Sequence, residues 1–128
     1  MQSEMKDHMA DVKAGRVTVE ILARQRLDRL AQKNPPVNAV IECHPDELIL
    51  QAQSLDRQLA AGKSFVLAGI VVTVKDNLDV KGMKSTAGLL KLKDNLAGSD
   101  SDVVAKLRQA GALILGKTNM APAAMDVQ

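Results

Sequence analysis

The sequence is poor in aromatic residues: it contains no Trp, no Tyr and a single Phe, Phe65. Stacking of nucleobases or sugars depends on aromatic faces, so this composition argues against proteins that bind them. The 17 basic and 15 acidic residues give a formal net charge of +2. They are spread along the chain and form no basic block of the kind that follows a phosphate backbone. We therefore expect no nucleic-acid partner.

Cysteine is almost absent, because Cys43 is the only one in the chain. A lone cysteine excludes an internal disulfide and is typical of a reducing compartment, so we expect a cytoplasmic location. Cys43 adjoins His44, but neither these residues nor His8 has a partner at the spacing of metal ligands, and we expect no metal site.

Long apolar runs are missing as well. No stretch approaches the ~20 residues that a bilayer span requires, so we expect no membrane span. The charged amino terminus also lacks the apolar segment of a signal peptide.

Helical periodicity dominates residues 1–62, which we interpret as a helical lead-in. Apolar residues at helical spacing predict a first helix over residues 4–14. Ser3 is the expected cap at its start, and Gly15 provides a left-handed stop.

Thr18 is the N-cap expected for a second helix, whose apolar stripe continues until Asn34 and the two prolines that follow it. Residues 37–41 predict a short extended segment. A third helix then follows, with Pro45 in its first turn, where proline is tolerated, and with its end at Gly62.

The composition changes at Lys63, and strand-like patterns begin. The stretch Ile70–Asp79, with the sequence IVVTVKDNLD, is a β-branched apolar run that ends in Lys, Asp and Asn. Such a run predicts a strand buried on both faces. Residues 78–98 are rich in Lys, Gly, Ser, Thr and Asn and predict an irregular loop, in which residues 85–90 could start a short helical turn.

A helix and a further strand follow the loop. Ser99–Asp102 resembles a capping box with Asp in place of Glu, and the helix after it should end at Gly111. Ala112–Leu115 predicts a second short buried strand, which the string GKTN follows.

Strand, helix and strand in this order form a βαβ unit, which predicts an α/β fold with two parallel strands and a right-handed crossover. Lys75 and Lys117 should then emerge at the same edge of the sheet. Open α/β sheets bind their ligands at this carboxyl edge. We interpret residues 1–128 as a single partial domain, with the lead-in over 1–62 and the βαβ portion over 63–128.

Lys75 is the main candidate for chemistry. A lysine at the end of a buried strand has apolar neighbours, which favour the neutral amine that acts as a base. The alternative is a solvated side chain, or a pair with Asp76 or Asp79, as is usual at strand ends. Lys117 lies in a GKT string like the end of a phosphate-binding loop, but the motif would cross a strand, so we expect no nucleotide site.

A family resemblance is carried by two segments, LAGIVVTVKDNLDVKGMKSTAG (Leu67–Gly88) and DVVAKLRQAGALILGKTNM (Asp102–Met120). Both resemble the amidase signature family, which contains amide hydrolases and the glutamine-hydrolysing subunit of tRNA-dependent amidotransferases. The upstream segment Asn34–Lys63 is similar to the helical lead-in of that family. The resemblance therefore covers nearly the whole chain, with its motifs in the family's order.

The resemblance implies a Ser–cisSer–Lys triad, in which a neutral lysine takes the proton of the nucleophilic serine through a bridging serine. Lys75 matches the triad lysine, and Met125 matches a position that can line the substrate site. The family's serines lie in a downstream glycine- and serine-rich segment that these 128 residues do not include. Ser85, Ser99 and Ser101 do not match their positions.

Two functional hypotheses follow from the resemblance. In the first, the chain is a truncated amidase-like protein, related to hydrolases of amide bonds but without the nucleophile segment, and is inactive alone. In the second, it is a non-catalytic remnant, or a regulatory or interaction module derived from an amidase. Whether the chain is an enzyme stays open between them.

The resemblance also implies an incomplete fold, consisting of the lead-in, the first strands and the crossover helix of a mixed, mainly parallel sheet. An uncovered sheet predicts self-association. The family implies no metal and no organic cofactor. A small-molecule amide is the expected substrate only if the full catalytic domain exists.

Overall fold

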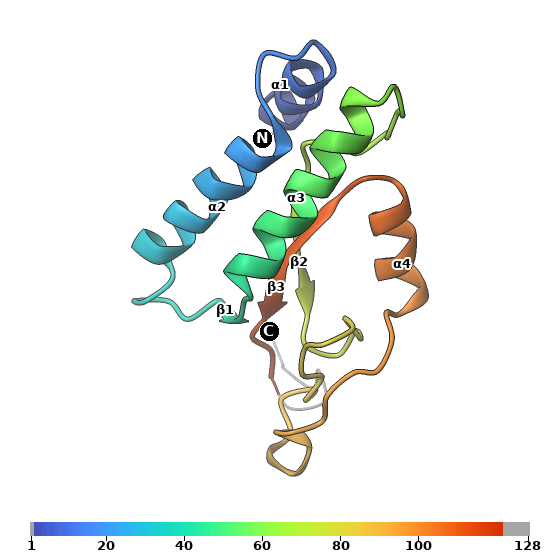
Figure 1. Ribbon diagram of the computed structural model, residues 1–128. Helices are drawn as coiled ribbons and strands as arrows, with labels where there is room; N and C mark the ends of the chain where they lie inside the picture. Colours follow the sequence, from blue (N-terminus) through green and yellow to red (C-terminus); the bar gives the residue numbers. More distant parts are fainter. Residues whose placement is uncertain (1, 122–128) are drawn as a thin grey trace.

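The computed structural model describes residues 2–121 (Figure 1). Its elements, in chain order, are α1 (Gln2–Lys13), α2 (Val19–Lys33), β1 (Val40–Glu42), α3 (Pro45–Ala60), β2 (Val71–Lys75), the 3₁₀ helix η1 (Leu90–Leu92), α4 (Asp102–Gln109) and β3 (Leu113–Thr118). This is an α/β fold, as the sequence predicted. No helix within residues 2–121 is long and apolar enough to cross a membrane.

The helical lead-in has the expected organisation. The Thr18 side chain accepts a hydrogen bond from the Ile21 amide and so caps α2, and Asn34 is its C-cap. Pro45 occupies the first turn of α3. Gly15 has a φ of 75°, the left-handed conformation that follows many helices. The expected cap at Ser3 is wrong, because α1 begins before it, at Gln2.

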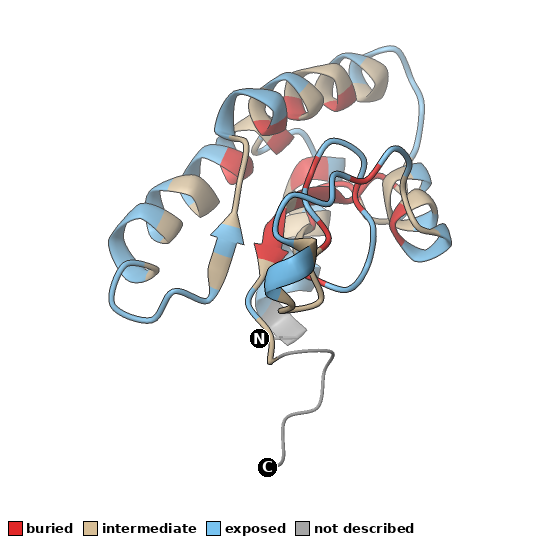
Figure 2. Ribbon diagram, turned by 90° about the horizontal axis from the view of Figure 1, so that it is seen from below, coloured by how far each residue is buried: buried red, intermediate tan, exposed pale blue. Residues whose placement is uncertain are grey.

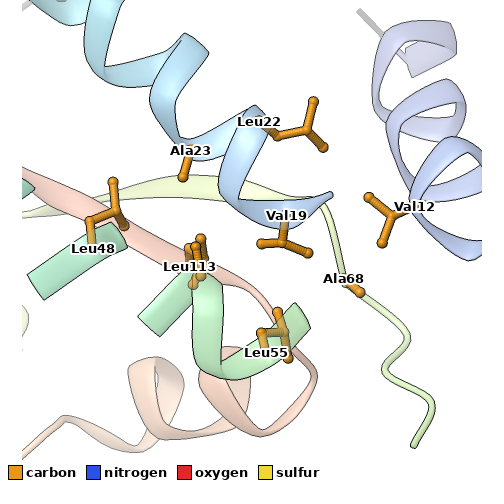
Figure 3. Close-up of a cluster of buried hydrophobic side chains, with 9 residues drawn as sticks. Val12, Val19, Leu22, Ala23, Leu48, Leu55, Ala68 and Leu113 are labelled. Atoms are coloured by element: carbon orange, nitrogen blue, oxygen red, sulfur yellow. The ribbon is translucent and has the colours of Figure 1, made fainter. Parts of the chain in front are cut away.

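Helices α2 and α3 lie side by side on one face of the sheet (Figure 1). Their facing sides form the main core with Leu113 of β3 and with Ala68 from the segment before β2 (Figure 3). Val12 extends this core to α1. Asp56 of α3 joins the two helices further, because its carboxylate accepts hydrogen bonds from the amides of Val19 and Glu20 at the start of α2.

The sheet has the strand order β1-β3-β2. Strands β2 and β3 are parallel, as predicted, and helix α4 lies between them in the chain. Strand β1 pairs with β3 in the antiparallel direction, so the sheet is mixed. The predicted extended segment at 37–41 is displaced toward β1, because the Asn34 side chain bonds both the amide and the carbonyl of Val40 and closes the turn before the strand.

Helix α4 covers the opposite face of the sheet from α2 and α3. Its Val104 packs with Ile114 of β3, with Val74 of β2, and with Val80 and Met83 from the following loop. Alternate residues of a strand face opposite sides, so Leu113 joins the core under α2 and α3 while Ile114 joins this second core. Buried residues therefore concentrate along β3 and on the helix faces turned toward it (Figure 2).

Two predictions in the second half need correction. Strand β2 is not buried on both faces, since Thr73 and Lys75 are exposed. It is an edge strand within residues 2–121, and the helices do not cover its carboxyl end. The capping box also lies two residues too early, because Ser101 is the N-cap of α4 and its side chain makes no capping bond. The predicted loop over residues 78–98 is correct, apart from η1.

Candidate functional site

The carboxyl ends of β2 and β3 meet at one edge of the sheet. Lys75 lies opposite Thr118, and Val74 lies opposite Lys117. The two lysines therefore emerge at the same edge, as the parallel pairing predicted. Figure 1 shows that the loop after β2 lies at this end of the sheet.

A β-bulge decides which way each lysine faces. The register shifts between Val72 and Thr73, so that Val72 pairs with Ile114 but Thr73 pairs with Gly116, and Leu115 is the extra residue. Because paired residues share a face, Lys117 faces the α4 side together with Val74. Lys75 faces the other side and is exposed.

Lys117 is fully buried, with 0% of its surface exposed. Its Nζ donates to the Lys84 carbonyl and to Ser85 Oγ, both at 3.0 Å. It also lies 3.7 Å from Asp76 Oδ1, and this carboxylate is nearly as buried. The sequence predicted a strand over Ala112–Leu115 with Lys117 after its end, but β3 continues through Thr118.

The Lys117 ammonium is surrounded by acceptors. Ser85 Oγ donates its own proton toward the Leu78 carbonyl at 3.4 Å, so it receives a bond from Lys117 and does not give one. Burial lowers the pKa of Lys117, and the carboxylates of Asp76, Asp79 and Glu42 oppose this shift. A buried carboxylate needs a positive partner, so we interpret Lys117 and Asp76 as an ion pair rather than Lys117 and Ser85 as a nucleophile and its base.

Asp76 is held from all sides. Its carboxylate accepts hydrogen bonds from Thr86 Oγ1 and, at 3.4 Å, from the Thr86 amide. Its own amide donates to the Thr118 carbonyl at 3.2 Å, and its carbonyl accepts from the Ala87 amide at 3.3 Å. The residue directly after Lys75 is therefore fixed in position.

Strand β1 completes the same arrangement. Glu42, which pairs with Lys117 across the sheet, accepts a hydrogen bond from the Lys84 amide at 2.9 Å. Residues 84–86 are thus held by one charged side chain from β1, one from β3 and one from the residue after β2. We call Glu42, Asp76, Lys117 and residues 84–86 the lysine clamp.

Lys75 is not part of the lysine clamp. The side chain of Lys75 makes no hydrogen bond or ion pair with residues 2–121, so it matches the solvated alternative and not the alternative of a pair with Asp76 or Asp79. Met125 lies outside the described residues. Within the described part of the chain, no group of three or more His, Cys, Asp or Glu residues could hold a metal ion.

The sequence resembles curated proteins that act on amides. It is 40% identical over 114 residues to the A subunit of glutamyl-tRNA(Gln) amidotransferase from Symbiobacterium thermophilum, a match that covers 88% of this chain and 23% of that protein. It is 34% identical over 114 residues to the indoleacetamide hydrolase of Bradyrhizobium diazoefficiens, covering 88% of this chain and 22% of that protein. The chain thus spans about a quarter of the length of the curated relatives it matches.

Solved structures agree with this likeness. The native peptide amidase from Stenotrophomonas maltophilia superposes with a TM-score of 0.80 at 35% identity, over 88% of this chain and 24% of that one. A bacterial aryl acylamidase of the amidase signature family superposes with a TM-score of 0.85 at 28% identity, over 93% of this chain and 25% of that one. The family model described as Amidase matches residues 22–128. The chain therefore belongs to the amidase family.

Proposed function

We propose that this chain supplies the lysine-bearing part of an amide hydrolase, with Lys75 as its catalytic base. The observation that carries the proposal is the position of Lys75 at the carboxyl end of β2, exposed and without a partner among the described residues. The ammonium of the neighbouring lysine, Lys117, is already engaged in an ion pair with Asp76 and in hydrogen bonds to the loop. Of the two lysines at this edge, Lys75 is the one that can approach a reacting group.

The proposed chemistry requires groups from another part of the family fold. In the amidase signature triad, the lysine acts through a bridging serine on the nucleophilic serine. No serine that the sequence places near this edge fits the role, because Ser85 is buried and bonded to Lys117. Packing of further residues around the Lys75 ammonium would remove it from water and favour the neutral amine, which is the form that accepts a proton.

A chimera tests this proposal. Residues 22–128 would replace the matching segment of the Stenotrophomonas maltophilia peptide amidase, and release of ammonia from a peptide amide would be measured. We expect hydrolysis, and a loss of about 10⁴-fold or more in kcat for Lys75→Ala, as for loss of a triad member. Lys81→Ala is the matched control, since Lys81 is an exposed lysine of the adjacent loop, and its kcat should not change.

The same lack of a partner bears on the alternative of a non-catalytic module, because within residues 2–121 Lys75 also has no hydroxyl on which to act. The 128-residue chain alone should therefore not hydrolyse simple amides. Amide hydrolysis by this chain that disappears in Lys75→Ala would overturn that expectation. An active chimera combined with an inactive isolated chain is the result that we expect.

A further inference from the structure

The lysine clamp and Lys75 lie on opposite faces of the sheet but are joined through one residue. Asp76 follows Lys75 in the chain, and its amide, its carbonyl and its carboxylate are all engaged. The direction in which Lys75 leaves the strand depends on the backbone at this point. Fixing Asp76 therefore also fixes the backbone point from which the Lys75 side chain leaves the strand.

We propose that Lys117 is a positioning residue, which holds Asp76 and residues 84–86 so that Lys75 is presented in one orientation at the sheet edge. This inference rests on the proposed function of Lys75. Lys117 itself touches no reacting atom, because it is fully buried on the opposite face.

The charge of Lys117 supports a role in orientation rather than in simple packing. Removing an ammonium and a carboxylate from water is costly, and apolar side chains of similar volume usually stabilise a core as well or better. Val104, Val74 and Ile114 already form an apolar core on this face, so an apolar residue at position 117 would have suitable neighbours. An ion pair with directed hydrogen bonds adds a unique geometry that apolar packing does not provide.

Lys117 also contacts two points of the chain that both lie more than thirty residues before it in sequence. Its bonds reach Lys84 and Ser85 in the loop, while its ion pair reaches Asp76 at the end of β2. Thr86, in the same loop, also donates a hydrogen bond to Asp76 and so connects the loop to the strand end. Loss of the ammonium should release the loop and the strand end together, and leave the layer of α2 and α3 in place.

Amide hydrogen exchange in the 128-residue chain tests this inference directly. The amides of Asp76 and Ala87 report the strand end, and the amide of Val19, bonded to Asp56 at 2.8 Å, reports the distant helical layer. In Lys117→Met, we expect the exchange rates of Asp76 and Ala87 relative to Val19 to rise about tenfold or more. A uniform acceleration at all three amides would mean a general loss of stability and would overturn the inference.

Two further variants keep the test decisive. Lys75→Met is the matched control, because it removes an exposed lysine at the same edge, and the relative exchange rates should not change. Thr86→Val removes the hydroxyl that donates to Asp76 and accepts from the Gly88 amide at 3.2 Å, and it serves if Lys117→Met does not fold. It should raise the same relative rates in the same direction, and no change in them would count against the inference.

The chimera separates this inference from the proposed function. There, Thr86→Val should lower kcat about tenfold while KM stays within about twofold, because the base is misdirected but the substrate contacts remain. A rise in KM at constant kcat would contradict a positioning role. If Lys75→Ala leaves the chimera fully active, the proposed function fails, whereas the exchange result still decides whether the lysine clamp holds the strand end.

Discussion

Substituting Gly116 by alanine should separate β1 from β3. A Cβ at position 116 would collide with the backbone carbonyl of Glu42 and would lie 3.1 Å from Val40 Cγ1. The Glu42 carbonyl cannot withdraw easily, because β1 is paired with β3 at both Val40 and Glu42. The Ala39 carbonyl holds β1 further, since it accepts a hydrogen bond from the Asn119 amide at 2.8 Å.

The magnitude follows from two opposing effects. Forcing an extra methyl group into a packed position typically costs about 1–3 kcal/mol, and a rigid backbone contact belongs at the upper end. Alanine gains about 0.4–1 kcal/mol over glycine, because it restricts the unfolded chain. We therefore expect Gly116→Ala to lower the free energy of unfolding by about 2 kcal/mol.

The assay is urea unfolding followed by far-ultraviolet circular dichroism, because the chain has no Trp or Tyr to serve as a fluorescent probe. Gly98→Ala is the matched control. Its Cβ would meet nothing within 4 Å, so its free energy of unfolding should change by less than about 0.5 kcal/mol. Equal stabilities of the two variants would refute the argument that β1 approaches β3 closely at Gly116.

Three other outcomes are expected. Leu48→Ala should cost about 2–5 kcal/mol in urea unfolding, because Leu48 is 2% exposed, whereas Leu50→Ala should be nearly neutral, because Leu50 is 64% exposed. Burial raises the pKa of Cys43, so iodoacetamide should alkylate it more slowly in the folded than in the unfolded chain, and equal rates would contradict this. The hydrogen bond from Arg26 lowers the pKa of Glu4 from 4.5. The stability advantage over Glu4→Gln should therefore be present above pH 4.5 and fade as the pH falls through the lowered pKa, and a pH-independent difference would exclude it.

Local signals in the sequence were sufficient for the start of α2, the start of α3 and the end of α1. Thr18, Pro45 and Gly15 act through their own backbone geometry or through hydrogen bonds to residues a few positions away. Their effects can therefore be predicted without knowing the fold. The parallel pairing of the two strands was also predictable, because a strand, a helix and a strand in succession permit few arrangements. The shared edge of Lys75 and Lys117 followed from that pairing.

The lysine clamp was not predictable, because it depends on contacts between distant segments. A bulge at Leu115 reverses the alternation of the strand, so simple periodicity gives Lys117 the wrong surroundings. Its acceptors, Lys84 and Ser85, are more than thirty residues away. The one local signal was a lysine inside an otherwise apolar strand next to Gly116, a residue that permits close backbone approach.

The bounds of strand β1, predicted as an extended segment over residues 37–41, were displaced for a similar reason. It has only three residues, and it is held by pairing with β3 and by the Asn34 side chain rather than by its own propensity. The expected burial of β2 on both faces was wrong because it needs neighbours that residues 2–121 do not supply, and Lys75 is exposed as a result. The proposed catalytic role of Lys75 and the substrate-lining role of Met125 stay predictions.

The central claim is that Lys75 is the base of an amide hydrolase, and one ratio tests it most directly: the kcat of Lys75→Ala divided by that of the parent chimera, on the same peptide amide. We predict a ratio of about 10⁻⁴ or below, with Lys81→Ala close to one. A chimera that hydrolyses the amide equally well with and without the Lys75 side chain would contradict the claim.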